Sequence, residues 1–416
     1  MSNASPFVYR VVLDGEDPAD PGAALDRDGD TQFAVTAITP GTNLFLNTVL
    51  NDRGYIIEAN DVIFVSVRFR SDFAPNQFPA GISIINHTGS GAINATLNEG
   101  ETYIIAVATD SGGNPNDLIG SLITSNKPIV VNTGSATGSS ANSFVAGGRD
   151  YGVDQIVDAS KVGTEYIFVR GNGGGDGIAN GDDGDRWENT LLVAHEDNTE
   201  IFVNGVVGVQ ATINAGEWVV IEGDGINQNG NGYSTAGNMY VQTSKPVFAY
   251  QGIGGQTGNA PNQGMFFVPP LSCENRGDVN NIANINSIGN ENNFEGGISI
   301  VTNRNSTVSV FQNDILKPIL ATEGPFDVDG NPDYVTYKLG GLQNNVKVES
   351  TGELYCAYFN ANGAAASGSF YSGFPSPPEI NFNTNVATLG NCIPNITLES
   401  LNADLFDTVE WFFDDG

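Results

Sequence analysis

Two acidic stretches of the chain place carboxylates at alternate positions around a glycine. They contain Asp26, Asp28 and Asp30 in one stretch and Asp327, Asp329 and Asp333 in the other. Oxygen ligands with this spacing can converge on one Ca²⁺ ion, as in an EF-hand loop. The bidentate Glu that closes an EF-hand is missing, because the twelfth positions are Ala37 and Lys338. The sequence therefore predicts Ca²⁺ as a cofactor at these aspartates, with ordinary Asp-Gly hairpin turns as the alternative.

Side chains suited to catalysis are few. The histidines, His87 and His195, follow equivalent strands of two repeats and are not expected to meet in one site. HExxH, GxSxG and SxxK motifs are absent from the sequence. The cysteines Cys273, Cys356 and Cys392 form no CxxC pair, which argues against zinc-finger and thioredoxin-like chemistry. We therefore predict a protein that is not an enzyme, with a carbohydrate-active enzyme that uses two carboxylates as the less favoured alternative.

The charge of the chain excludes some partners. The 416 residues include 16 Lys and Arg against 48 Asp and Glu, a net charge of −32. Such a chain repels phosphate backbones and anionic lipid headgroups, so nucleic acid is not an expected partner. The sequence also lacks an apolar run of about 18 residues, so membrane insertion is not expected. Low Lys content and abundant Asn, Gly, Ser and Thr favour an extracellular location.

Strand patterns dominate the elements that would position these residues. Short β-branched and aromatic runs bounded by Gly, Asn, Asp and Pro predict strands at 62–69, 103–107, 166–169 and 247–250. An amphipathic stretch of about 12 residues at helical period is missing. The sequence therefore predicts an all-β fold.

Internal repetition organises these strands. Residues 96–105 match residues 212–221 at an offset of 116 (212 − 96), as strand, Asn-x-Gly-Glu turn and strand. A second anchor, Lys-Pro before an apolar run, recurs at Pro128 and Pro246, which are 118 apart (246 − 128). A weaker third copy extends from 297–300 to 350–357. These matches predict three β-sandwich-like units of about 110 residues each.

The predicted domains follow from the repeats. A β segment at 1–60 packs on the first repeat, and the repeats occupy 61–150, 151–270 and 271–380. Residues 381–416 open an Ig-like or PKD-like module that is truncated here, with a strand at 396–399. Trp411 follows Cys392 by 19 residues (411 − 392), and the two would line its core. The natural protein is expected to continue beyond Gly416.

Three longer motifs resemble a known family. They are GRDYGVDQIV at 148–157, KVGTEYIFVRG at 161–171 and NQGMFFVPPLSC at 262–273, and the paired Ser-Lys-Pro strands accompany them. Together they resemble the IgGFc-binding-protein N-terminal domain family across about residues 60–375. The bacterial branch of that family is similar to N-terminal regions of large Bacteroidetes surface proteins, exported by type IX secretion and including SprB-like gliding adhesins. The resemblance offers no catalytic motif and implies surface display and binding.

The resemblance leads to one functional expectation and one alternative. We expect a non-catalytic adhesion module at the cell surface that binds glycans or extracellular polymers weakly and multivalently. Its other partners would be the type IX secretion machinery and downstream modules of the same polypeptide. Tyr233, Phe370 and Tyr371 could stack on sugars or could be core residues. The alternative is a structural tip or stalk cap without a ligand of its own.

Overall fold

The protein is described here by a computed structural model. It describes residues 9–12, 49–50, 55–58, 92–98, 101–103, 105, 118–135, 152–171, 188–223, 225–253, 264–272, 277–287, 293–362, 365–372, 380–384 and 396–400. Strands dominate these residues, accompanied by short 3₁₀ helices at Ala159–Lys161 and Ile226–Gln228, so the all-β prediction is confirmed. Within the described ranges, no helix is both long and apolar enough to span a membrane.

The first sandwich, as we call residues 163–267, is built around one long strand. Its strands are β7 (Gly163–Val169), β8 (Thr190–Ala194), β9 (Thr199–Val203), β10 (Ala211–Ile213), β11 (Trp218–Ile221), β12 (Asn238–Ile253) and β13 (Gly264–Phe267). The first half of β12 pairs with β7 and β9, and its second half pairs with β8 and β13. Strand β9 continues to β10 and strand β8 to β11. The sandwich thus has one layer with β7, β9 and β10 and another with β8, β11 and β13, and β12 contributes one half to each layer.

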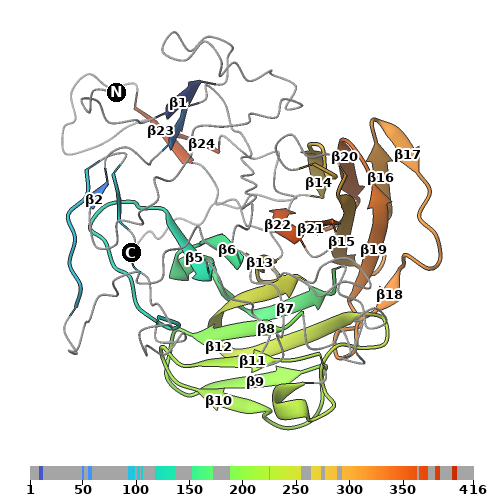
Figure 1. The fold of residues 1–416 in the computed structure, drawn as a ribbon, viewed down its shortest axis with the longest axis horizontal. Coiled ribbons are helices and arrows are strands. Elements are labelled where there is room, and N and C mark those ends of the chain that lie inside the picture. The colour runs from blue at the N-terminus through green and yellow to red at the C-terminus, as the bar shows by residue number, and fades with distance from the viewer. Residues whose placement is uncertain are drawn as a thin grey trace, which may run out of the picture.

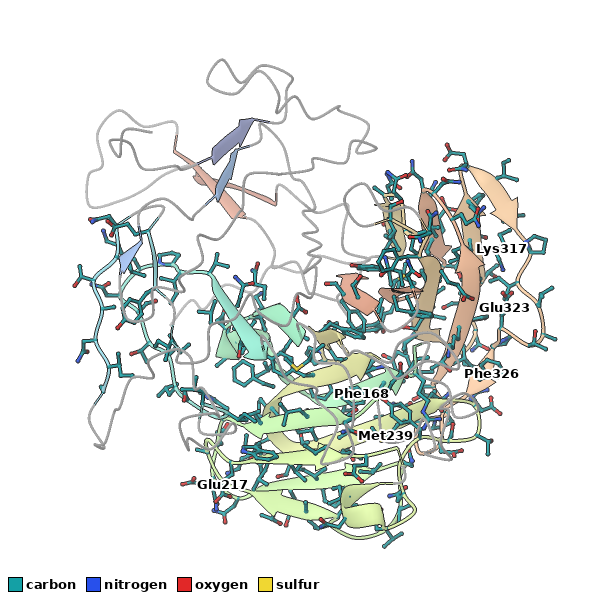
Figure 2. All side chains as sticks on the ribbon, in the orientation of Figure 1. Phe168, Glu217, Met239, Lys317, Glu323 and Phe326 are labelled. Carbon is teal, nitrogen blue, oxygen red and sulfur yellow. The ribbon has the colours of Figure 1, made fainter. Side chains whose placement is uncertain are left out.

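Alternation along these strands defines the core of the first sandwich. Leu192 and Ala194 on β8, and Ile201 and Val203 on β9, are buried, while the residues between them are more exposed. Successive side chains of a strand point to opposite faces, so every second residue enters the core. The β-branched and aromatic composition seen in the sequence therefore fills the space between the layers (Figure 2).

The second sandwich, residues 278–372, has two separate sheets. Its strands are β14 (Asp278–Ile282), β15 (Glu295–Asn303), β16 (Val308–Gln312), β17 (Ile315–Lys317), β18 (Phe326–Asp327), β19 (Tyr334–Leu342), β20 (Val346–Ser350), β21 (Tyr355–Asn362) and β22 (Ala365–Ser372). One sheet has the order β14-β20-β16-β17 and the other the order β18-β19-β15-β21-β22. One apolar cluster, which includes Ile298, Val310 and Val348, draws its residues from both sheets.

Both sandwiches pair their strands in the same way. Val241 of β12 lies opposite Val203 of β9, and Val348 of β20 lies opposite Val310 of β16. The second half of β12 pairs with β8 and β13, as β21 pairs with β15 and β22. Strand β20 of the second sandwich therefore corresponds to the first half of β12, and β21 corresponds to its second half. The predicted repeat is present in these two units, whereas the count of three stays a prediction because few residues of 61–150 are described.

The Asn-x-Gly-Glu turn is confirmed by its hydrogen bonds. The Glu101 amide donates to the Asn98 carbonyl at 3.1 Å, and the Glu217 amide to the Asn214 carbonyl at 2.8 Å. The Glu carboxylate in turn accepts from the Asn amide, at 2.7 Å in the first turn and 2.8 Å in the second. A third such turn, at 320–323, was not predicted, since it has neither Asn nor Gly. There Leu320 and Glu323 exchange the same two bonds, at 2.8 Å each.

The sandwiches pack directly on one another. Strands β15 and β21 are buried along nearly their whole length, which means that both of their faces are covered. One face meets the second core, and the other presents Val301 and Tyr355 to Ile167, Val169 and Tyr240 of the first sandwich. A strand buried on both faces has a nearly continuous apolar sequence, as β21 has.

Equivalent strands meet at the centre of the molecule. Strand β5 (Val131–Ser135) pairs with β6 (Gly152–Ile156), as β12 pairs with β13 and β21 with β22. Strand β6 contacts β13, and β13 contacts β22. Figure 1 shows these strands in the middle, with the first sandwich below and the second to one side. The units therefore spread outward from a shared line of equivalent strands.

The remaining described strands form short pairs. They are β1 (Tyr9–Val12) with β3 (Tyr55–Glu58), β2 (Val49–Leu50) with β4 (Thr102–Tyr103), and β23 (Ile380–Thr384) with β24 (Ile396–Ser400). Strand β24 confirms the strand predicted at 396–399. The strand predicted at 62–69, and Cys392 and Trp411 of the predicted module, lie outside the described residues. The domain boundaries stay a prediction.

Candidate functional site

The acidic loop between β18 and β19 is held by one arginine. Arg304 Nη1 donates to Asp327 Oδ1 at 2.7 Å, and the Arg304 amide donates to the Asp333 carbonyl at 2.7 Å. Arg304 Nε also donates to the Pro332 carbonyl. Arg304 thus fixes both ends of the loop and neutralises its first carboxylate.

The same loop lies at the junction of the two sandwiches. Gly330, at φ 83°, packs so closely on the Asn204–Gly205 turn that a Cβ there would lie 2.3 Å from the Gly205 nitrogen. The Tyr240 hydroxyl hydrogen-bonds to Asn331 and Glu165, and burial followed by the charge of Glu165 raises the pKa of Tyr240. The loop is therefore a joint between the sandwiches.

A buried amide completes this joint. Asn238 of β12 donates through Nδ2 to Thr336 Oγ1 at 2.8 Å and to the Asp327 carbonyl at 2.9 Å. Asn238 is fully buried, so replacing it would leave the Thr336 hydroxyl or the Asp327 carbonyl without this donor. The polar contacts of the joint add specific geometry to the apolar packing around it.

The structure describes only some of the predicted calcium ligands. Asp327 pairs with Arg304, and Asp329 and Asp333 point to solvent. Among the residues that the structure describes, no group of three or more His, Cys, Asp or Glu side chains is placed to hold a metal ion. Asp26, Asp28 and Asp30 lie outside those residues. Calcium binding stays a prediction, for which ion-dependent stability is the direct measurement.

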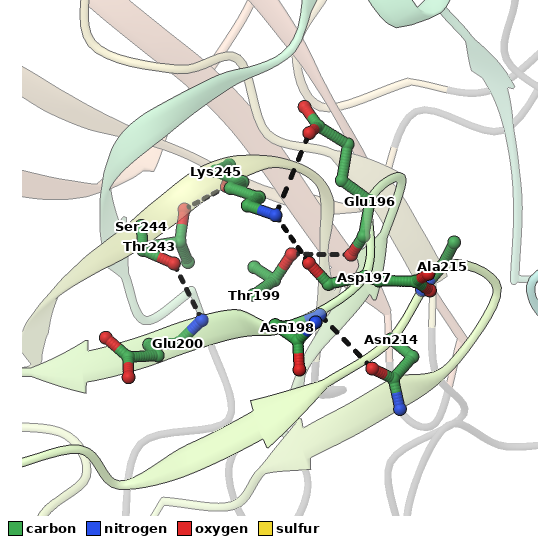
Figure 3. A network of polar contacts seen from close by, with 10 residues as sticks. All are labelled: Glu196, Asp197, Asn198, Thr199, Glu200, Asn214, Ala215, Thr243, Ser244 and Lys245. Carbon is green, nitrogen blue, oxygen red and sulfur yellow. Dashed lines mark hydrogen bonds and ion pairs between the residues drawn. The ribbon is translucent and has the colours of Figure 1, made fainter.

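The Ser-Lys-Pro motif of β12 forms the bend at which the strand passes between sheets. Lys245 Nζ donates to the Asp197 carbonyl at 2.6 Å and lies 3.9 Å from Glu196 Oε2 (Figure 3). The Glu200 amide donates to Ser244 Oγ at 2.8 Å. The first contact ties the bend to the β8–β9 turn and the second ties it to the start of β9, so this part of the motif has a structural role.

The repeat turn at Asn214 joins the same network. The Asn198 amide donates to Asn214 Oδ1, and the Ala215 amide donates to Asp197 Oδ1, each at 3.1 Å (Figure 3). The two sequence anchors of the repeat, the Asn-x-Gly-Glu turn and the Lys-Pro bend, are therefore both fixed by the β8–β9 turn between them.

A glutamate and two tyrosines form a network that the sequence did not reveal. Glu353 Oε2 accepts from the Tyr334 hydroxyl at 3.0 Å and from the Tyr355 hydroxyl at 2.8 Å. The Tyr355 hydroxyl also contacts the backbone of Ser272. Burial, followed by the charge of Glu353, raises the pKa of Tyr355, so its phenol stays protonated. The network connects Ser272, at the end of the segment that follows β13, to the second sandwich.

Two of the three aromatic side chains considered for sugar stacking pack against the core of the first sandwich. Arg170 lies over the ring of Tyr233, 4.9 Å from its centroid, and burial raises the pKa of Tyr233. Phe370 packs edge-on against Phe266, with ring centroids 5.4 Å apart. These two rings are partly buried and pack against the core of the first sandwich, while the side chain of Tyr371 lies outside the description. His195 is exposed beside the Phe248 ring, and His87 is not described.

A buried carboxylate links β6 to β13. Asp154 Oδ2 accepts from the Phe267 amide at 2.8 Å. Burial raises the pKa of Asp154 from its ordinary value of 3.8 to about 6, although the backbone hydrogen bonds from Phe267 and Gln155 act in the opposite direction. The contact between these equivalent strands therefore includes a group that titrates in mildly acidic solution.

A family model described as IgGFc binding protein matches residues 23–359. No curated protein and no solved structure matches the chain.

Proposed function

Because the chain belongs to the IgGFc binding protein family, we propose that it is a non-catalytic binding module of a large bacterial surface protein. The observation that carries the proposal is the extent of the family match, which covers the first sandwich and the second sandwich as far as residue 359. The module would be exported by the type IX secretion machinery, as in the Bacteroidetes proteins that its motifs resemble, and downstream modules would follow it. Its position would be the cell surface, and gliding motility is the process that it would serve.

The ligands proposed are glycans or extracellular surface polymers. A chain with a net charge of −32 favours neutral or cationic surfaces over anionic ones. Weak contacts of single modules would gain strength from many copies on one cell. Since Tyr233 and Phe370 are partly buried and held against the core, the contacts would come from polar side chains of exposed turns.

Retention on defined surfaces tests the proposal. The full chain would be passed over agarose, chitin and mucin coatings, with a charge-matched acidic protein as the control. We expect concentration-dependent retention that increases when the chain is displayed in many copies on beads. Equal retention of the control, or no retention at any density, would contradict the binding function and leave a structural cap at the tip of a stalk.

Calcium is proposed as a stabilising cofactor of the two acidic stretches. A ligand that binds the folded state alone raises the free energy of unfolding, by about 2.7 kcal/mol at a hundredfold excess over Kd. Thermal unfolding in Ca²⁺ and in EGTA measures this effect, and the Asp329→Asn and Asp28→Asn variants assign it to one stretch. Identical unfolding in both solutions would reduce the stretches to ordinary turns.

A further inference from the structure

Strand β17 is the free edge of its sheet. Among the described strands it pairs with β16 alone. Gln312 and Ile315 lie opposite one another across a two-residue turn, and such flanking residues form a hydrogen-bonded pair. The next residue, Leu316, therefore directs its N–H and C=O away from β16. An exposed edge of this kind can accept another strand.

The side chains of this edge are apolar and exposed. Ile315 is 72% exposed and Leu316 is 58% exposed, and Leu320 follows them on the surface. Between Asp314 and Glu323 the only charged residue is Lys317, which pairs with Glu323 at 2.8 Å (Figure 2). Edges that must stay unpaired usually carry unpaired charges or proline. Here the one charge is neutralised by Glu323, and Pro318 lies just beyond the last residue of β17, so Leu316 is the residue of this strand that offers both an outward N–H and an outward C=O.

The edge is fixed in place before any partner arrives. Asn313 and Asp314 have φ values of 50° and 61°, the conformation of the hairpin turn that matches strand twist. The Asn313 amide donates to the Asn345 carbonyl at 2.9 Å, which ties the turn to the neighbouring strand. Binding at β17 would therefore cost little ordering of the hairpin.

The first sandwich gives a precedent for this hairpin as a contact. Its equivalent turn, Asn204–Gly205, is also followed by exposed apolar residues, and Val207 is 99% exposed. That turn packs on Gly330 of the second sandwich. The same hairpin of the repeat thus already forms a protein contact once in the described structure.

The charges around the edge indicate which charge a partner would carry. On the outer face of the same sheet, the carboxylates of Asp278, Asp314 and Glu349 surround a single lysine, Lys347. Together with the net charge of the chain, this arrangement attracts a basic polypeptide. Two copies of this acidic chain would repel one another at the same edge.

We propose that the free edge of β17 binds an extended, basic segment of a second protein, which adds to the sheet as a further strand and places its alternate apolar side chains beside Leu316, on one face of the sheet. Backbone hydrogen bonds at Leu316 provide the pairing, and the alternate apolar residues provide selectivity. This surface is separate from the glycan-binding function proposed above, so either one can fail alone.

Binding of a model strand to the full chain tests the proposal. The probe is a fluorescein-labelled peptide of four Val-Lys repeats, and the matched probe has four Gly-Lys repeats. We expect fluorescence anisotropy to show binding of the valine peptide, with binding weakened at least about tenfold by Leu316→Pro or Leu316→Lys. Pro at this position removes an outward N–H without breaking the β16 ladder.

The control variant is Val130→Lys, which makes the same charge change at an exposed apolar residue elsewhere. It is expected to bind the peptide normally, and thermal unfolding confirms that each variant is folded. Equal binding of the glycine peptide, equal weakening by Val130→Lys, or no peptide binding by the folded chain would overturn the proposal. So would concentration-dependent dimers that Leu316→Pro abolishes, since the occupant would then be a second copy. Retention of the same variants on agarose, chitin and mucin reports the glycan function separately.

Discussion

The two sandwiches share a register but differ in the strand that crosses between their sheets. In the first sandwich, three residues, 244–246, separate Thr243 from Val247, and β12 continues through the bend. In the second, five residues, 351–355, separate the equivalent Ser350 from Cys356, and β20 and β21 are distinct strands. The pairing on either side is unaffected. The fold therefore depends on the inward residues of the paired strands and tolerates a longer connection.

The outer faces of the sandwiches differ more than their cores. The β7–β12 face presents Ile167, Val169 and Tyr240, which the second sandwich covers. The equivalent β14–β20 face of the second sandwich carries Lys347 and Glu349, paired at 2.6 Å and partly exposed. In stacked repeats a polar outer face marks the end of the stack. Inward residues thus define each unit, and outward residues decide whether another unit packs on it.

The largest expected effect comes from truncating one buried side chain in the core of each sandwich, at equivalent positions. Leu192 and Ile298 are both fully buried and face partner residues in the same register. We expect Leu192→Ala and Ile298→Ala each to lower the free energy of unfolding by about 2–5 kcal/mol. Because the sandwiches pack together, both variants should shift one common transition in calorimetry.

Val207→Ala is the control, since Val207 is almost fully exposed and should change stability little. If Leu192→Ala and Ile298→Ala moved two different transitions, the sandwiches would be independent units.

The next effect tests the outer face of β15. Gly297 corresponds to Leu191 of the first sandwich, but a Cβ at Gly297 would lie 2.3 Å from the Phe359 ring. Gly297→Leu is therefore expected to destabilise the protein by about 3 kcal/mol through overpacking. Gly340→Ala, where a Cβ meets no atom within 4 Å, is the matched control in chemical denaturation. Equal stability of the two variants would show that this face is not closely covered.

The third prediction concerns how stability depends on pH. The β6–β13 contact contains a carboxylate that titrates, so its contribution to stability should change with pH, whereas that of the β13–β22 contact should not. Since burial raises the pKa of Asp154 to about 6, the ionised carboxylate costs folding free energy at neutral pH. This cost is absent well below pH 4, where Asp154 is protonated in both states, grows as the pH rises from about 4 to about 6, and is constant above that range. We expect Asp154→Asn to stabilise the protein by about 2 kcal/mol at pH 7.5 and not at pH 3.5.

The measurement is the difference in melting temperature between Asp154→Asn and the unmodified chain across this pH range. Phe266→Leu at the β13–β22 contact should show a difference that does not change with pH. A constant difference for Asp154→Asn as well would mean that this carboxylate does not titrate there.

The smallest effect concerns the repeat turn. Glu217→Ala and Glu323→Ala each remove a carboxylate that accepts the first amide of its turn, at 2.8 Å in both cases. Each should cost about 1 kcal/mol, and Glu323→Ala somewhat more because Lys317 loses its partner. Urea unfolding measures both, with Glu200→Ala as the exposed control. No loss in either variant would show that the carboxylate is replaceable by water.

The sequence predicted the features that are local. Short β-branched runs predicted β7 and the second half of β12, and the Asn-x-Gly-Glu pattern predicted two turns. The third turn, at 320–323, was not predicted from the sequence. Its hydrogen bonds need only backbone groups and one Glu, so the turn has no distinctive amino-acid composition. The contact of Tyr355 with Ser272 joins residues 83 apart, and the pairing of Asp327 with Arg304 joins residues 23 apart. Such partners are set by the packing of sheets, which single-residue patterns do not encode.

The continuous course of β12 has a mechanical consequence. A pull on Gly163 and Phe267, the ends of the first sandwich, enters β12 at the paired residues Val247 and Tyr250, which belong to one continuous strand. In the second sandwich the load passes through the short connection between β20 and β21, and the sheets can separate one after the other. In single-molecule stretching we therefore expect the second sandwich to yield at lower force, which would let it lengthen under tension while the first stays folded.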